Sequence, residues 1–320
     1  MDIHIPNSAF LGNIDGTFLR RFNPAEEGIL HISANPKWIA IHPMALAMTA
    51  ALGLTLPSSK IICETMKAKS AHYLVRMKLF DFLKIDCGIT INEHDSSGRF
   101  IPLTQIKTSD ELSRFLQEMV PLLHLEPDKA KPIKYIVSEL VRNVLEHALS
   151  PHGAIVCAQY FEASNKIAIG IADTGVGIKS SMETSYKTAD DLEAVRLALQ
   201  PGITGTTTRE GGTEQNAGAG LFFIKSIATV NRDFFMIYSG SAAYKLLRRR
   251  TEAVRLHADP FKDRHSAGTD FPYWKGTVVG IDISLDQTAE FSTLLGYISD
   301  TYSAAVKERR KARYKKANFI

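Results

Sequence analysis

The sequence is poor in cysteine and nearly balanced in charge. Its 320 residues include three cysteines, Cys63, Cys87 and Cys157, which are scattered and lack the spacing of a metal site. Isolated thiols in odd number predict a disulfide-free fold in a reducing, cytoplasmic environment. The formal net charge of +4 is too small to argue for a nucleic-acid partner.

Internal repeats, low-complexity tracts and a secretory signal are also missing. The first six residues have neither the basic nor the apolar segment of a signal peptide. Residues 38–56 are apolar enough to suggest a membrane span, but His42 and Pro43 interrupt them. We expect no span, and instead a short buried strand over Trp38–Ile41 and then a helix over 43–51.

The chain has the composition of a soluble globular protein, with 45% hydrophobic and 22% charged residues, and its length suits two domains. We expect an α/β domain over 1–107, a connecting helix over 108–125, a second domain over 126–286, and a C-terminal helix with a basic tail over 287–320. In the first domain, short strands and helices should alternate over 28–33, 38–41, 43–51, 59–63 and 70–82.

A helix is predicted over residues 128–149, because its apolar residues recur at i, i+3, i+4 and i+7. Glu139, Asn143 and His147 fall on one stripe at the edge of this apolar arc. A half-buried carboxylate can activate a water, and an amide oxygen can bind Mg²⁺. The alternative is an ordinary solvated helix edge. Arg142 projects to a different side and is expected at the surface.

A β-hairpin is predicted next, because residues 153–161 and 166–172 alternate in polarity around a polar turn. Asp173 follows the second strand and opens the motif Asp-Thr-Gly-Val-Gly, which contains Gly175 and Gly177. Such glycines let the backbone approach a ligand closely. Taken alone, the motif fits a tight turn equally well.

Two further pieces complete the pattern. Gly218, Ala219, Gly220 and Leu221 precede an apolar helix over 222–230, and backbone amides at a glycine-opened helix start suit a phosphate group. A strand over 275–283 follows, with Thr277 near its beginning, where it could share a water with Asp173.

In this order, the four pieces resemble the ATP-binding domain of the GHKL superfamily, over roughly residues 126–286. That group includes histidine kinases, anti-sigma-factor serine kinases, type II topoisomerases and mismatch-repair ATPases. The resemblance implies a Bergerat-type α/β sandwich, in which helices cover one face of a mixed, mainly antiparallel sheet. It also implies ATP and Mg²⁺ as ligands.

The resemblance assigns roles to the motif residues. It makes Glu139 the general base or water-polarising group, Asn143 the Mg²⁺ ligand and Asp173 the partner of the adenine amino group. The remaining nucleotide contacts that it implies are Gly175 and Gly177 at the base, Gly218, Gly220 and Leu221 at the phosphates, and Thr277 as a support for Asp173. His147 is either a phosphate contact, as in many kinase-type relatives, or a polar helix edge.

Between the two glycine motifs, the resemblance places an ATP lid. A helix is predicted over 190–199, and a glycine-rich run follows over 201–212. Thr207, Thr208 and Arg209 would reach the phosphates when the lid closes. The glycine content fits plain disorder as well.

The chain shows no sign of the dimerising helices of a sensor histidine kinase or of a transducer domain. Its first region resembles a STAS-like α/β unit, of the kind that anti-sigma serine kinases bind. The alternative is a cap that only completes the fold. We therefore expect a Mg-ATP-dependent regulatory switch with slow ATP hydrolysis, a signalling or STAS-like protein partner, and an open possibility of a homodimer.

Two other functions stay open. One is a serine/threonine protein kinase of the anti-sigma-factor type that acts on a STAS-like partner. The other is nucleotide-dependent nucleic-acid binding through the basic residues 307–316, for which a solvated helix end is the alternative. The basic run Lys245–Arg250 is expected to be a surface loop.

Overall fold

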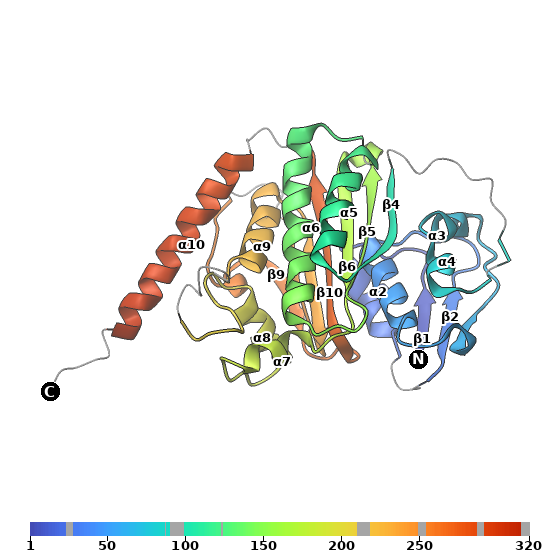
Figure 1. Ribbon diagram of the computed structural model, residues 1–320, viewed down its shortest axis with the longest axis horizontal. Coiled ribbons are helices and arrows are strands. Elements are labelled where there is room, and N and C mark those ends of the chain that lie inside the picture. Colours follow the sequence, from blue (N-terminus) through green and yellow to red (C-terminus); the bar gives the residue numbers. More distant parts are fainter. Residues whose placement is uncertain are drawn as a thin grey trace.

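Two β-sheets organise the chain in the computed structural model (Figure 1). The smaller sheet is parallel and has the order β1 (Asp2–Ile5), β2 (Leu30–Ala34), β3 (Ile61–Cys63). The residues that the structure describes are 1–23, 28–86, 88–89, 99–122, 124–209, 218–248, 254–286 and 291–314.

The larger sheet has seven strands, and all its neighbouring strands are antiparallel. Their order is β4 (Phe100–Ile106), β5 (Ala154–Phe161), β6 (Lys166–Ala172), β10 (Trp274–Ser284), β7 (Phe235–Gly240), β8 (Ala242–Leu246), β9 (His265–Gly268). The expected α/β sandwich with a smaller α/β region before it is confirmed. Resemblance of that region to STAS units stays a prediction.

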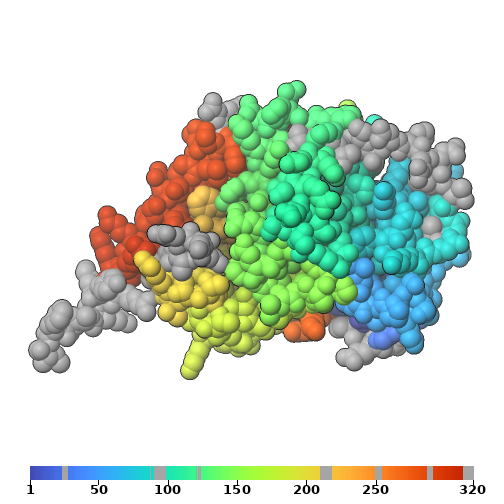
Figure 2. Space-filling view, viewed as in Figure 1, coloured from blue at the N-terminus to red at the C-terminus, as the bar shows by residue number. Residues whose placement is uncertain are grey.

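The α-helices of the described residues are α1 (Ile14–Thr17), α2 (Pro43–Gly53), α3 (His72–Arg76), α4 (Leu79–Leu83), α5 (Ser109–Leu122), α6 (Pro127–His147), α7 (Gly177–Glu183), α8 (Asp191–Ala198), α9 (Gly220–Asn231) and α10 (Phe291–Tyr314). Helices α5, α6 and α9 lie on one face of the larger sheet (Figure 1). Helix α10 packs on α9 and α6 at the end of the molecule opposite the N-terminal region (Figures 1 and 2).

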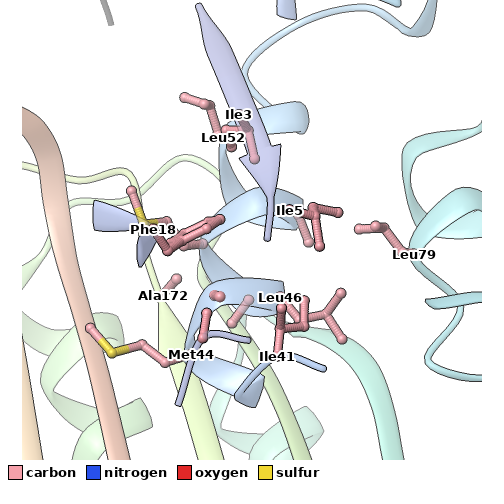
Figure 3. Packing of buried hydrophobic residues seen from close by; sticks show 14 of the residues in the cluster. Ile3, Ile5, Phe18, Ile41, Met44, Leu46, Leu52, Leu79 and Ala172 are labelled. Carbon is pink, nitrogen blue, oxygen red and sulfur yellow. The ribbon is translucent and has the colours of Figure 1, made fainter. Parts of the chain in front are cut away.

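Both faces of the larger sheet are buried, whereas helices were expected on one face. Successive residues along β5 alternate between two cores: Val156 faces α6, and Cys157 faces the N-terminal region. The second face is covered by α2, all of whose residues are buried. In Figure 3, side chains from β1, α2, α4 and the end of β6 meet in this core.

Helix α2 packs against two glycines of the larger sheet. A Cβ at Gly170 of β6 would lie 2.2 Å from the backbone of Pro43, and one at Gly280 of β10 would lie 2.7 Å from the sulfur of Met44. These glycines are cross-strand partners. Cys157 adds a hydrogen bond from its thiol to the Pro43 carbonyl oxygen at 3.3 Å. The first turn of α2 is therefore packed directly against the sheet backbone.

Most elements expected from residue 108 onward form within a few residues of their predicted bounds. Thr108 begins α5 with a capping box: its hydroxyl accepts from the Glu111 N–H, and the Glu111 carboxylate accepts from the Thr108 N–H, each at 3.2 Å. Asp190 caps α8 by accepting from the Glu193 N–H at 2.8 Å. The predicted hairpin is β5 and β6.

The N-terminal predictions fit less well. Residues 38–41 do not form a strand; Ile41 makes an isolated bridge to Ala9, and Trp38 is exposed. The helix expected over 70–82 is broken into α3 and α4, because Lys78 adopts a left-handed conformation with φ of 59°. None of the helices in the described part of the chain is long and apolar enough to cross a membrane.

The basic run at 245–250 was expected to be a surface loop, but this is wrong for its first residues. Lys245 lies in β8 and is buried, and its ammonium group contacts a carboxylate oxygen of Asp15 at 2.7 Å. Residues 249 and 250 lie outside the described residues. The larger sheet begins at Phe100, upstream of residue 126, and shares a core with the N-terminal region. The division of the chain into domains stays a prediction.

Candidate functional site

A cavity of about 340 Å³ opens between α6 and the larger sheet. Its walls come from the second half of α6, the end of β6, α7, residues 203–205, the start of α9 and inward-facing residues of β7 and β10. The residues assigned from the sequence that line it are Glu139, Asn143, His147, Asp173, Gly177, Gly218, Gly220, Leu221 and Thr277.

Helix α6 supplies the predicted stripe of polar groups. Pro127 occupies the first helical turn, and Ile133, Ile136 and Leu140 bury the opposite arc in the core. Glu139 faces the cavity with its side chain 26% exposed. Burial raises the pKa of Glu139, and the nearby Arg142 guanidinium partly offsets this. A carboxyl with a raised pKa suits a group that accepts and releases a proton.

Asn143 carries an unsatisfied group into the site. Its side-chain Nδ2 is buried and has no hydrogen-bond partner among the described residues. Leaving a buried amide unpaired costs about 1–3 kcal/mol, so such a group is suited to binding a ligand. Rotation of the amide exchanges its nitrogen and oxygen, and the oxygen suits Mg²⁺. Asn143 thus fits a metal held jointly by the protein and by phosphate oxygens.

Asp173 is the most deeply buried acid of the cavity. It follows β6 directly, is 1% exposed, and accepts one hydrogen bond from the Gly175 N–H at 2.8 Å. Burial raises its pKa to about 7, although the backbone hydrogen bonds of Gly175 and Thr277 oppose the shift. This buried carboxyl can still accept a hydrogen bond from a ligand in the cavity.

Close backbone contacts hold the loop after Asp173 in place. A Cβ at Gly175 would lie 1.9 Å from the Ala148 carbonyl oxygen at the end of α6. Gly177 has φ of 77°, which only glycine adopts without strain. Gly175 itself does not line the cavity, so its place is behind the site. The two glycines let the loop pass between α6 and the sheet.

Ser239 of β7 links the segments next to Asp173 by hydrogen bonds. It was not predicted from the sequence. Its hydroxyl accepts from the Ile178 N–H at 2.9 Å and donates to the Gly276 carbonyl oxygen at 2.7 Å. The Thr277 hydroxyl donates to Ser239 at 3.4 Å, while the Thr277 carbonyl oxygen accepts from the Asp173 N–H at 2.9 Å. Thr277 therefore supports Asp173 through its backbone. No sequence signal marks Ser239, because pairing of β7 with β10 brings it here.

The start of α9 meets Glu139. A Cβ at Gly220 would lie 2.6 Å from Glu139 Oε2, so a larger residue here would push this carboxylate away from the helix start. Gly218 has φ of 62° and accepts a hydrogen bond from the Gly202 N–H at 3.0 Å. The amides of the first helical turn are oriented for an anion, and the helix dipole favours one.

Part of the expected lid lies outside the described residues, which end at 209 and resume at 218. Thr207, Thr208 and Arg209 do not line the cavity, and Arg209 donates its N–H to the Thr207 hydroxyl at 3.1 Å. Their contact with phosphates stays a prediction. Thr204 and Gly205 line the cavity instead.

Arg142 and Glu146 line the cavity mouth, although neither was assigned to the site. Arg142 is exposed, as expected, but it does not point away from the stripe. Its Nη1 lies 3.7 Å from Glu139 Oε1, and its Nε lies 3.2 Å from Glu146 Oε1. Spacings of three and four residues on a helix are a signal that could have found these contacts.

The family model of the histidine kinase-like ATPase domain matches residues 104–231. This match runs from β4 to the end of α9, so it contains Glu139, Asn143, Asp173 and Gly220 and stops before Thr277. Comparison with curated proteins gives no match.

Proposed function

We propose that the cavity binds ATP with Mg²⁺ and that nucleotide turnover makes the protein a regulatory switch, because residues 104–231 match the family model of the histidine kinase-like ATPase domain. The observation that carries this proposal is the buried Asp173 at the cavity floor. The adenine amino group is a donor that matches this carboxyl, and it would satisfy a group that burial otherwise penalises.

The phosphates then lie toward the other end of the cavity, near α6 and α9. The amides at the start of α9 face them, and Asn143 holds Mg²⁺ together with phosphate oxygens. Bound Mg²⁺ would neutralise phosphate charge. Glu139, which touches the start of α9, is placed to orient a water against the terminal phosphorus and to take its proton. Water adds to phosphorus, the bond to the bridging oxygen breaks, and ADP and phosphate leave.

The route of the switch follows from the packing of the sheet. Ala172, directly before Asp173, and Val278, directly after Thr277, are buried in the same core as α2. A shift at the adenine end of the site therefore reaches the N-terminal region through adjacent residues. This supports a regulatory readout in that region or in a protein bound to it, which we propose is a signalling or STAS-like partner.

A protein serine/threonine kinase is the second candidate, and the position of Glu139 favours it. The side chain is 26% exposed at the cavity, so a hydroxyl of another protein has access to the same base. The nucleic-acid alternative rests on the exposed Lys307, Arg310 and Lys311 of α10. Binding of that kind must weaken steeply as salt rises. Cytoplasmic location and a homodimer stay predictions.

Phosphate release from Mg-ATP by wild type and by Glu139→Gln tests the switch. We expect slow release by wild type and a loss of at least about a hundredfold in the variant, with ATP binding retained. Glu118→Gln, at an exposed position of α5, is the matched control and should behave as wild type. Equal release by wild type and Glu139→Gln would remove Glu139 from the mechanism. ATP binding without release would favour the kinase, and transfer to an added STAS-like protein would then be measured.

A further inference from the structure

Arg142 is the one permanently charged cation among the described residues that line the cavity. The acids that line the same cavity are Glu139, Glu146 and Asp173. A nucleoside triphosphate would add several negative charges to this acidic space. Mg²⁺ offsets only part of that charge, so a cation at the phosphate end is needed for binding.

Arg142 is held loosely by its two acidic neighbours on α6. Its contact to Glu146 at 3.2 Å joins two exposed side chains, 48% exposed for Arg142 and 44% for Glu146, whereas its contact to the half-buried Glu139 is longer, at 3.7 Å. The exposed pair with Glu146 contributes little and the contact with Glu139 is long, so the guanidinium can exchange them for another anion at small cost. Bidentate arginine–phosphate contacts are stronger than either pair.

We propose that Arg142 binds the terminal phosphate of the nucleotide and thereby makes the site distinguish ATP from ADP. This inference rests on the proposed ATP site. Its position follows from Glu139: if that carboxylate orients water at the terminal phosphorus, then the guanidinium group beside Glu139 lies at the same phosphate. Before the nucleotide binds, Arg142 pairs with Glu146. The Glu146 carboxylate therefore competes with the terminal phosphate for the guanidinium group.

This competition predicts opposite changes in ATP affinity for variants of Arg142 and Glu146, which a merely structural role would not give. Removing Arg142 should weaken ATP binding, whereas removing the charge of Glu146 should strengthen it, because the guanidinium group no longer has to leave a partner. If the gain came only from a weaker negative field, Glu146→Gln would also strengthen binding in a protein that lacks Arg142. The double variant therefore separates the two explanations.

The experiment measures ATP and ADP affinities by calorimetry, with Mg²⁺, for wild type, Arg142→Gln, Arg142→Lys, Glu146→Gln and the double variant Arg142→Gln/Glu146→Gln. We expect Arg142→Gln to weaken ATP binding by about tenfold to a hundredfold and ADP binding by less than about threefold. Arg142→Lys should restore part of the loss. Glu146→Gln should tighten ATP binding by about twofold to fivefold, and this gain should vanish in the double variant.

Lys134→Gln is the matched control, because it removes the same charge from an exposed position of α6 that does not line the cavity. It should leave both affinities unchanged. Circular dichroism checks the fold of each variant. Unchanged ATP affinity in folded Arg142→Gln, or an equal loss for ATP and ADP, would overturn the role of Arg142 and leave the ATP site standing. Failure of wild type to bind either nucleotide would overturn the proposed function and this inference with it.

Discussion

Asp173→Asn should make the stability of the nucleotide-free protein less sensitive to rising pH while it destroys nucleotide binding. The carboxyl is 1% exposed, and burial raises its pKa from an ordinary 3.8 to about 7. Between these two values the folded state holds more protons than the unfolded state, so the free energy of unfolding falls as pH rises. Raising the pKa from 3.8 to about 7 corresponds to about 4 kcal/mol of folding stability lost once the pH exceeds 7.

Asparagine removes this pH-dependent cost but buries an amide in exchange. The amide oxygen can keep the hydrogen bond from the Gly175 N–H, while the new NH₂ group lacks a partner, which costs about 1–3 kcal/mol at any pH. The absolute change is therefore modest. The pH dependence of this change is the better test. The free energy of unfolding of the variant minus that of wild type should be larger at about pH 8 than at about pH 5, by roughly 3 kcal/mol.

Urea unfolding of both proteins without nucleotide, at these two pH values, measures the difference. Asp233 also has a pKa raised by burial to about 7, but it is present in both proteins and cancels. A stability difference between variant and wild type that is the same at both pH values would refute the argument that burial disfavours the ionised Asp173.

Two further predictions concern the metal and the packing of α2. Asn143→Ala should weaken ATP binding about tenfold when Mg²⁺ is present and little in EDTA, measured by calorimetry; an equal loss in both conditions would contradict a metal role. Gly170→Leu should lower the free energy of unfolding by about 3 kcal/mol or more, because a Cβ there already meets the Pro43 backbone at 2.2 Å. Gly16→Ala, with open space around it, is the control. Similar losses in the free energy of unfolding for both variants would refute the close packing of α2 against Gly170.

The parts of the site that local geometry determines could be predicted from the sequence. Helical periodicity placed Glu139, Asn143 and His147 on one stripe, and all three line the cavity. Alternation in the hairpin placed Asp173 at a strand end, where it is buried. These predictions needed only the spacing of side chains within one element.

The parts that depend on long-range pairing could not be predicted. Ser239 enters the corner behind Asp173 because β7 pairs with β10, and Lys245 is buried because its partner Asp15 lies 230 residues away. The charge run around Lys245 gave the opposite expectation. Coverage of the second sheet face by α2 depends on Gly170 and Gly280 meeting across two strands, which no local pattern indicates.

Calorimetry of ATP with Mg²⁺ against wild type and Asp173→Asn tests the central claim most directly, with GTP as the comparator. Wild type should bind ATP, and it should reject GTP, because guanine presents a carbonyl oxygen where adenine presents its amino group. The variant should lose at least about a hundredfold in ATP affinity, because its amide cannot match the carboxyl at the adenine. Undiminished ATP binding by a folded Asp173→Asn protein would contradict the assignment of this cavity as the adenine site.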